Sequence, residues 1–180
     1  MKVTDAIHRL AIHDRKGRQV YTQADLGIIF REDSLKTLRA GLNRLVKAGI
    51  LKRAVPGVYV NMVSANSYLN TLESIASAMW EGEYNYISLE SALSEWGVIS
   101  QIPMRLTVMT TGRKGEFNTP FGTIEFTHTT RSLGDILEDI HDIGRPLRMA
   151  GKHKAVRDLK RVGRNLDLIE EEILYEDEQN

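Results

Sequence analysis

The sequence predicts an α+β fold of two domains, and three patterns along the chain support this prediction. Apolar residues recur at helical spacing in the first quarter of the chain. β-branched residues concentrate in two later stretches, residues 50–62 and 105–129, and a helical pattern returns near the C-terminus. We therefore expect an N-terminal domain over residues 1–63. A small α/β domain with an antiparallel meander and a C-terminal amphipathic helix is expected over residues 64–180.

Charge is segregated along the chain in a similar way, although the formal net charge is zero. Residues 1–62 hold 12 Lys and Arg against 5 Asp and Glu, whereas residues 63–144 hold 4 against 11. Residues 145–164 hold 8 against 1, and residues 165–180 hold 0 against 7. A basic N-terminal domain joined to an acidic middle is typical of a polyanion-binding module attached to a second function.

Two short helices are expected at the start of the N-terminal domain. The first covers residues 4–13 and has Thr4 as its N-cap. The second covers residues 23–30 and follows Thr22, which is also expected to act as an N-cap. The apolar residues expected to face the core are Ile7, Leu10, Ala11, Leu26, Ile29 and Phe30.

A third and longer helix is expected to begin at Asp33 or Ser34 and to end before Gly49, because glycine accepts the left-handed conformation that follows many helices. One face carries an apolar stripe of Leu35, Leu38, Leu42, Leu45 and Val46. At about 100° per residue, the opposite face is basic, and it is narrow because Ala40 and Gly41 add little bulk. Such a face suits the major groove of DNA, which is about 12 Å wide.

The outward face of this third helix supplies the expected DNA contacts. The candidates for base contacts are Lys36, Thr37, Ala40 and Asn43. Asparagine pairs bidentately with adenine, and threonine packs its methyl group on that of thymine. Arg44 and Lys47, nearer the helix end, are candidates for phosphate contacts, and Arg39 for either kind. The alternative for such a helix is a solvated face that binds nothing.

A β-hairpin is expected directly after this helix. Its strands cover residues 50–55 and 57–62, and it carries Lys52 and Arg53 as candidates for phosphate contacts. Three helices followed by a basic hairpin are the element order of a winged helix-turn-helix, in which the third helix enters the major groove. We therefore expect the N-terminal domain to bind double-stranded DNA.

The second domain is expected to begin with two helices and continue with a three-stranded antiparallel meander. The helices cover residues 67–80 and 89–96, and the latter is capped by Ser88 and ended by Gly97. The strands cover residues 105–111, 116–119 and 123–129. The segment between the first two strands is then a strand-to-strand turn.

That turn lies in the stretch TTGRKGEF, Thr110 to Phe117, and its glycine spacing does not match a catalytic loop. A P-loop needs four residues between its glycines, and the nucleotide-clamping KH loop joins two helices. The chain has no cysteine, and its histidines lie in no metal-ligand spacing. We expect no catalytic site, no cofactor and no metal. Arg113 and Lys114 remain candidates for a secondary contact with DNA backbone or a protein partner.

A C-terminal helix is expected over residues 152–174. Its heptad-like seam consists of Leu159, Val162, Leu166, Ile169 and Ile173. Packing within its own domain is one interpretation, and a homodimer seam is the alternative. Basic residues gather at its start and acidic ones at its end, which opposes the helix dipole. We hypothesise that Lys160, Arg161 and Arg164 contact DNA phosphate or an acidic protein surface.

Composition points to a reducing compartment. The absence of cysteine excludes disulfide scaffolds and thiolate metal sites. Charged residues interrupt the first twenty positions, so neither a signal peptide nor a membrane span is expected. A soluble cytoplasmic protein is therefore expected.

Several motifs resemble those of the AbiEi antitoxins of bacterial type IV toxin-antitoxin systems. They are RLVKAGILKRAVPGVYV, the helix start SLESAL, Gly97 after that helix, and the TTGR turn. The likeness covers residues 20–130, and these antitoxins include shorter members that are transcriptional regulators. It implies a winged helix that binds inverted repeats in its own promoter and represses it. It also implies neutralisation of a co-encoded nucleotidyltransferase-like toxin, without an obligatory stable complex.

Two other functions compete with this one. The first is a winged-helix repressor whose second domain only dimerises. The second is a protein that inhibits a toxin by binding it directly, with DNA binding incidental. An enzyme is not expected.

Overall fold

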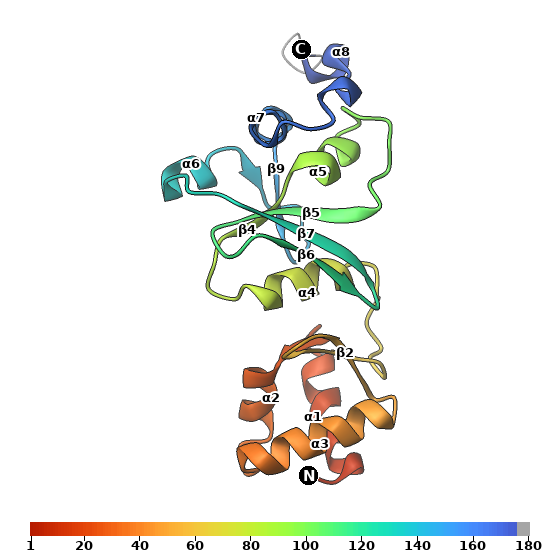
Figure 1. Cartoon of the computed structure of the whole chain (residues 1–180). Coiled ribbons are helices and arrows are strands. Elements are labelled where there is room, and N and C mark those ends of the chain that lie inside the picture. Colours follow the sequence, from red (N-terminus) through yellow and green to blue (C-terminus); the bar gives the residue numbers. More distant parts are fainter. Residues whose placement is uncertain (176–180) are drawn as a thin grey trace. The chain divides into compact units, whose positions relative to one another are not determined.

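The computed structural model describes residues 1–175 and has the α+β fold that the sequence predicts (Figure 1). It divides into two compact units, which we call unit 1 (residues 1–79) and unit 2 (residues 80–180, described to 175). This division falls later in the chain than residue 63, because one more helix groups with unit 1. Across residues 1–175, no helix is both long enough and apolar enough to cross a bilayer.

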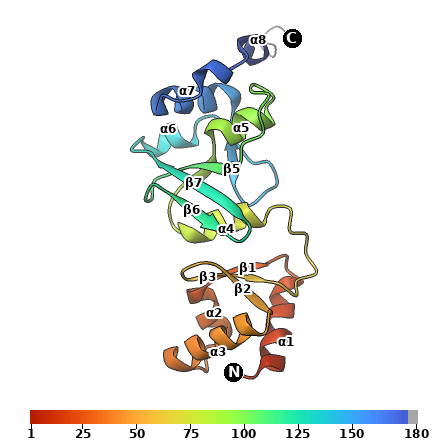
Figure 2. The same ribbon diagram turned by 45° about the vertical axis from the view of Figure 1, so that its right-hand side comes forward.

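Unit 1 begins with three helices and a three-stranded antiparallel sheet of order β1-β3-β2. The elements are α1 (Val3–Asp14), β1 (Val20–Thr22), α2 (Gln23–Ile29), α3 (Leu35–Lys47), β2 (Leu51–Val55) and β3 (Val58–Asn61). The helices lie on one side of this sheet (Figure 2). The helices and the hairpin agree with the sequence prediction, whereas β1 was not expected. Strand β1 has only three residues, and its partner β3 lies far along the chain.

Apolar residues of the three helices and the hairpin form one core. Its buried members include Leu10, Tyr21, Leu26, Phe30, Leu38, Leu42, Leu45, Leu51 and Tyr59. Three of them come from α3, so the predicted apolar stripe does fix this helix to the rest of unit 1. The prediction is wrong at one position of the stripe, because the Leu35 side chain is 70% exposed.

Thr22 caps the start of α2, as the sequence predicts, and the structure shows that this cap is a capping box with Asp25. The hydroxyl of Thr22 accepts a hydrogen bond from the backbone N–H of Asp25 at 3.1 Å, and the Asp25 carboxylate accepts one from the backbone N–H of Thr22 at 2.8 Å. The prediction for α1 is wrong, because its N-cap is Lys2 and Thr4 lies inside the first turn.

This difference gives a matched pair of stability variants. Thr22→Ala is expected to lower the free energy of unfolding of unit 1 by about 0.5 to 2 kcal/mol, since a backbone donor of the helix start loses its partner. Thr4→Ala is expected to change it by less than about 0.5 kcal/mol, because exposed Thr4 caps nothing. Urea titrations followed by helical circular dichroism check both. Equal losses in the two variants would contradict the role of the capping box.

Helix α4 (Thr71–Met79) completes unit 1 and packs against β1 and β3. The prediction began this helix at residue 67, but Tyr68 and Leu69 precede it and Leu69 is 89% exposed. Ile75 and Ala76 form its buried apolar face. The apolar pattern of residues 68–69 therefore misplaced the helix start by about one turn.

Unit 2 is built on a six-stranded mixed sheet of order β6-β7-β5-β4-β9-β8. Its elements are β4 (Asn85–Ile87), α5 (Leu89–Glu95), β5 (Arg105–Thr110), β6 (Gly115–Thr119), β7 (Gly122–His128), α6 (Leu133–Leu137), β8 (Ile140–His141), β9 (Arg148–Ala150), α7 (Lys152–Val162), a 3₁₀ turn (Leu166–Leu168) and α8 (Glu171–Tyr175). Helix α5 packs against both β5 and α7 (Figure 1).

The predicted antiparallel meander is wrong. Strand β7 lies between β5 and β6 and pairs with β5 in parallel, so the chain after β5 crosses over to the sheet edge instead of turning back beside it. Burial gives the physical reason. Val108 of β5 and Ile124 of β7 are fully buried, whereas no residue of β6 is buried, so β6 suits the edge.

The predicted continuous C-terminal helix is also wrong. Helix α7 ends at Gly163, which adopts a left-handed conformation at φ +76°, and the heptad-like seam is therefore broken. Within this seam Leu159 is buried, but Leu166 beyond the break is 43% exposed. The opposition to the helix dipole disappears for the acidic residues, because Glu171 and Glu172 lie in the first turn of the separate helix α8. It remains for Lys152 and Lys154, which lie in the first turn of α7.

Candidate functional site

The outward face of α3 is the first candidate site. Ser34 caps the helix by accepting a hydrogen bond from the backbone N–H of Thr37 at 3.2 Å. The buried leucines on the other side hold the candidate face outward. All the candidate contacts of this helix are exposed: Lys36, Thr37, Arg39, Ala40, Asn43, Arg44 and Lys47. The structure therefore presents the predicted set on one surface.

The cations of this face differ in how they are engaged. Among residues 1–175, no carboxylate pairs with Lys36, Arg39 or Lys47. Arg44 is different, because its Nη2 donates a hydrogen bond to the backbone carbonyl of Met1 at 3.1 Å. Three cations without an anionic partner on one helix face make this surface suited to bind an external polyanion.

Gly41 has a role other than the predicted one. It is buried, and a Cβ atom at this position would lie 3.0 Å from Cε of Met1 and 3.1 Å from its sulfur. The absence of a side chain at this position therefore admits Met1 against α3, and Gly41 does not shape the outward surface. Of the two small residues, only Ala40 lies on the outward face.

Leu35 is a residue of this site that the sequence assigned to the core. At the first turn of α3 it lies 70% exposed beside Lys36 and Thr37, and Ile28 of α2 is 74% exposed. An exposed apolar side chain at the start of such a helix can contact a thymine methyl group. Helical periodicity could not identify Leu35, since the position fits the end of the apolar stripe equally well.

The β2–β3 hairpin carries the remaining candidates of unit 1. Lys52 and Arg53 lie on β2, and both are exposed while their neighbours Leu51 and Ala54 are buried. The turn is made possible by Gly57 at φ +83°. The hairpin therefore adds two basic side chains to the surface of the unit that contains α3.

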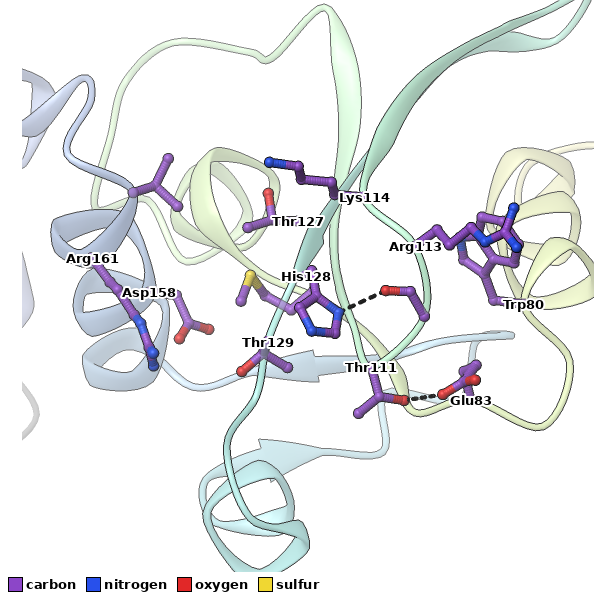
Figure 3. A pocket seen from close by; sticks show the side chains of 13 residues that line it. Trp80, Glu83, Thr111, Arg113, Lys114, Thr127, His128, Thr129, Asp158 and Arg161 are labelled. Carbon is purple, nitrogen blue, oxygen red and sulfur yellow. Dashed lines mark hydrogen bonds between the residues drawn. The ribbon is translucent and has the colours of Figure 1, made fainter.

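A groove in unit 2 brings together three other predicted residues. It has a volume of about 1020 Å³, and Arg113, Lys114 and Arg161 all line it. Figure 3 shows Arg161 on α7 at one side and Arg113 and Lys114 on the other. Residues nearly fifty positions apart in the chain therefore share one cavity, which sequence spacing alone did not indicate.

The segment after β5 is held close to its surroundings. The backbone N–H of Gly112 donates to the Thr110 hydroxyl at 2.9 Å, and the Gly112 carbonyl lies 2.7 Å from Nδ1 of His128. A Cβ atom on Gly112 would lie 3.3 Å from Cγ of Trp80 and 3.2 Å from Cγ of Glu83. This glycine therefore permits close packing of the segment against Trp80 and Glu83.

Beside the groove lies a buried polar cluster centred on Asp158, whose side chain is fully buried. Its carboxylate pairs with Arg131 at 2.7 Å and accepts hydrogen bonds from Ser88 at 2.7 Å and Tyr86 at 3.2 Å. Lys154, also fully buried, donates from Nζ to the Asp135 carbonyl at 2.6 Å. Burial raises the pKa of Tyr86 and lowers that of Lys154.

The other two predicted cations of the C-terminal segment lie outside the groove. Lys160 is exposed on α7. Arg164 donates to the Glu90 carboxylate at 2.7 and 2.9 Å and pairs with Glu125 at 2.6 Å. Burial alone would raise the pKa of Glu90, but hydrogen bonds from Arg164 and Asn165 hold it below its usual range. The guanidinium of Arg164 is thus engaged within unit 2.

The SLESAL motif has a structural role in unit 2. Ser88 reaches Asp158, Glu90 reaches Arg164, and the Ser91 hydroxyl donates to the Arg105 carbonyl at 3.2 Å. The sequence suggested that Ser88 caps α5, but its side chain makes no capping hydrogen bond. The polar residues of the motif connect α5 to α7 and to the start of β5.

Comparison of the sequence with protein-family models yields no match, and comparison with curated proteins yields no significant match. Among residues 1–175, no three His, Asp or Glu side chains are grouped in a way that could hold a metal ion. A functional interpretation therefore depends on the two surfaces described above, the outward face of α3 with its hairpin and the groove of unit 2.

Proposed function

We propose that this protein is a cytoplasmic DNA-binding antitoxin of a bacterial type IV toxin-antitoxin system, which represses its own operon and counteracts a nucleotidyltransferase-like toxin. One observation carries the DNA-binding part. The exposed face of α3 holds Lys36, Arg39 and Lys47 without carboxylate partners among the described residues, in the unit that also exposes Arg53.

The element order of unit 1 supports a winged helix-turn-helix. Helices α1, α2 and α3 are followed by the β2–β3 hairpin. In such a domain the third helix lies in the major groove, where Lys36, Thr37 and Asn43 would face base edges. Arg53 on the hairpin and Lys47 at the helix end would then lie along the phosphate backbone.

The antitoxin part rests on the resemblance to AbiEi antitoxins. The motifs that carry the resemblance lie in both units, from the α3–β2 segment to the residues that follow β5. Binding to inverted repeats would place two protomers on one operator, since a repeat with two-fold symmetry matches a symmetric pair of domains. A homodimer is therefore part of the proposal.

Salt dependence tests the DNA-binding part. Arg44, Lys47, Lys52 and Arg53 are the candidate phosphate contacts; if each neutralises one phosphate, the slope of log K against log salt is expected to be about −3.6 per protomer. Fluorescence anisotropy with the protein's own promoter fragment measures this slope. A slope near zero would exclude electrostatic DNA binding by this surface.

Co-expression tests the antitoxin part. Expression of the neighbouring gene alone is expected to arrest growth, and expression of both genes is expected to restore it. A variant with substitutions on α3 that abolish DNA binding is the control, because it separates repression of the promoter from neutralisation of the toxin. If growth resumes only when the promoter is repressed, the protein is a repressor without antitoxin activity.

A further inference from the structure

The groove of unit 2 has the size and composition of a small-molecule site. Its volume of about 1020 Å³ lies at the upper end of the range that is common for such sites, roughly 300 to 1,000 Å³. One wall consists of Trp80 and the residues after β5, and the other consists of α7 with Arg161 and Val162. Figure 3 shows His128 between these walls. An elongated ligand would contact both walls at once.

The charge of the groove favours an anion. Arg113, Lys114 and Arg161 line it from two sides, and no carboxylate among residues 1–175 pairs with any of them. Both lining carboxylates are engaged, since Glu83 accepts a hydrogen bond from Thr111 and Asp158 pairs with Arg131. Residues 63–144 carry only 4 basic groups against 11 acidic groups, and two of these four cations, Arg113 and Lys114, line the groove.

The kind of anion follows from the geometry of these groups. Guanidinium groups bind phosphate oxygens through two parallel hydrogen bonds, and a lysine adds a point charge. Cations on opposite walls fit a ligand with more than one phosphate oxygen to offer, such as a chain of phosphates. The hydroxyl of Thr127 also lies in the lining and adds a neutral donor.

The groove also offers apolar surface next to its cations. Trp80, Met109 and Val162 line it. The indole of Trp80 is held by edge-to-face contacts with Phe117 and Phe126, with ring centroids 6.1 and 5.8 Å apart. A phosphate ion alone would leave this surface unused, whereas a planar ring attached to phosphate would cover it.

The wall that carries Arg113 and Lys114 is fixed before any ligand arrives. The backbone N–H of Thr111 donates to the Tyr84 carbonyl at 3.1 Å, and the backbone N–H of Thr129 donates to the Thr110 carbonyl at 2.8 Å. Together with the contact between Gly112 and His128, these bonds hold the backbone of this wall, from the end of β5 to the end of β7. A preformed site of this kind loses less entropy on binding.

We propose that the groove of unit 2 binds a nucleotide, with its phosphates between Arg161 and the Arg113–Lys114 pair and its base against the apolar surface at Trp80. The site is independent of the DNA-binding face of α3. It gives unit 2 a ligand of its own, of a chemical class that the fold and the motifs did not indicate.

Calorimetric titration of the full chain with ATP, GTP and UTP tests the proposal. At least one of them is expected to bind, and to quench the fluorescence of Trp80, which lines the groove. Adenosine or the matching nucleoside is expected to bind at least about tenfold more weakly, because it lacks the phosphates. Inorganic phosphate is expected to bind more weakly too, because it lacks the base.

Variants locate the binding. Lys114→Ala and Arg161→Ala, both at exposed positions, are each expected to weaken nucleotide binding about tenfold or more. Lys160→Ala is the matched control, since Lys160 is exposed on the same helix but does not line the groove, and it is expected to bind as the parent protein does.

Four results would overturn the proposal. The first is that none of the three nucleotides binds at millimolar concentration, and the second is that the Lys114, Arg161 and Lys160 variants lose affinity equally. The third is that inorganic phosphate binds as tightly as the nucleotides. The fourth is that a single-stranded oligonucleotide binds where mononucleotides do not. A loss of ATP affinity in Lys36→Ala would assign the binding to α3 and would overturn it as well.

Discussion

The variant that carries both Lys36→Ala and Asn43→Ala is expected to bind its operator between roughly 30-fold and 20,000-fold more weakly than the parent protein. Each contact to a base edge contributes about 1 to 3 kcal/mol. The two residues lie about 10 Å apart along α3, so their losses are expected to add. Both side chains are exposed, and the core of unit 1 is therefore expected to stay intact. Anisotropy titrations with promoter fragments at one salt concentration measure the loss.

The comparison with random DNA decides the role of these residues. Arg53→Ala is expected to weaken operator and random DNA alike, because a phosphate contact positions the protein without specifying sequence. The double variant is expected to lose more on the operator than on random DNA. Equal losses on operator and random DNA would remove Lys36 and Asn43 from the base contacts. Leu35→Ala would then be the first variant to test for sequence preference.

Asp158→Ala is expected to lower the free energy of unfolding of unit 2 by about 3 to 5 kcal/mol. The change leaves Arg131, whose side chain is 18% exposed, without its anion, and it removes the acceptor of Ser88 and Tyr86. Both tryptophans of the chain, Trp80 and Trp96, lie in unit 2. Tryptophan fluorescence during urea unfolding therefore reports on this unit.

An exposed ion pair of the same unit provides the control. Glu95 pairs with Arg145 at 2.7 Å, and the Glu95 side chain is 41% exposed. Glu95→Ala is expected to cost at most about 1 kcal/mol, because solvent screens such pairs. If Asp158→Ala destabilised the protein no more than Glu95→Ala, the buried cluster would not hold α7 to the sheet.

Local patterns were enough to predict much of unit 1. Helices α1, α2 and α3 have capping residues, helix-period stripes or a terminal glycine within their own sequence, and the β2–β3 hairpin has Pro56-Gly57 between its strands. Strand β1 escaped prediction because three residues show no period. Its existence depends on β3, which is out of reach of any local window.

The sheet of unit 2 shows the same limit more strongly. Strands β4, β8 and β9 have two or three residues each, and β4 pairs with β9 from much later in the chain. Chain order suggested that β5 and β6 are neighbours, but the more buried β7 takes the place beside β5. The end of α7 was missed for another reason, because the apolar seam continued past Gly163 and outweighed the glycine signal.

The candidate sites were predictable to different extents. Helical geometry was sufficient to place the basic face of α3 outward, since one helix supplies every member. It misassigned Leu35, because a stripe does not show where the core ends. The groove of unit 2 was beyond such reasoning, since Trp80, Lys114 and Arg161 belong to segments that only the folded sheet brings together.

The pairing of β4 with β9 also bears on synthesis of the protein. Strand β4 has β5 on one side and β9 on the other, and β9 begins only at Arg148. While the ribosome adds the intervening residues, β4 is an edge strand with unsatisfied backbone groups beside Tyr86 and Ile87, which are buried in the finished sheet. Such an edge invites association with another chain. Fragments that stop before Arg148 are therefore expected to aggregate, whereas all of unit 1 is already present by Met79.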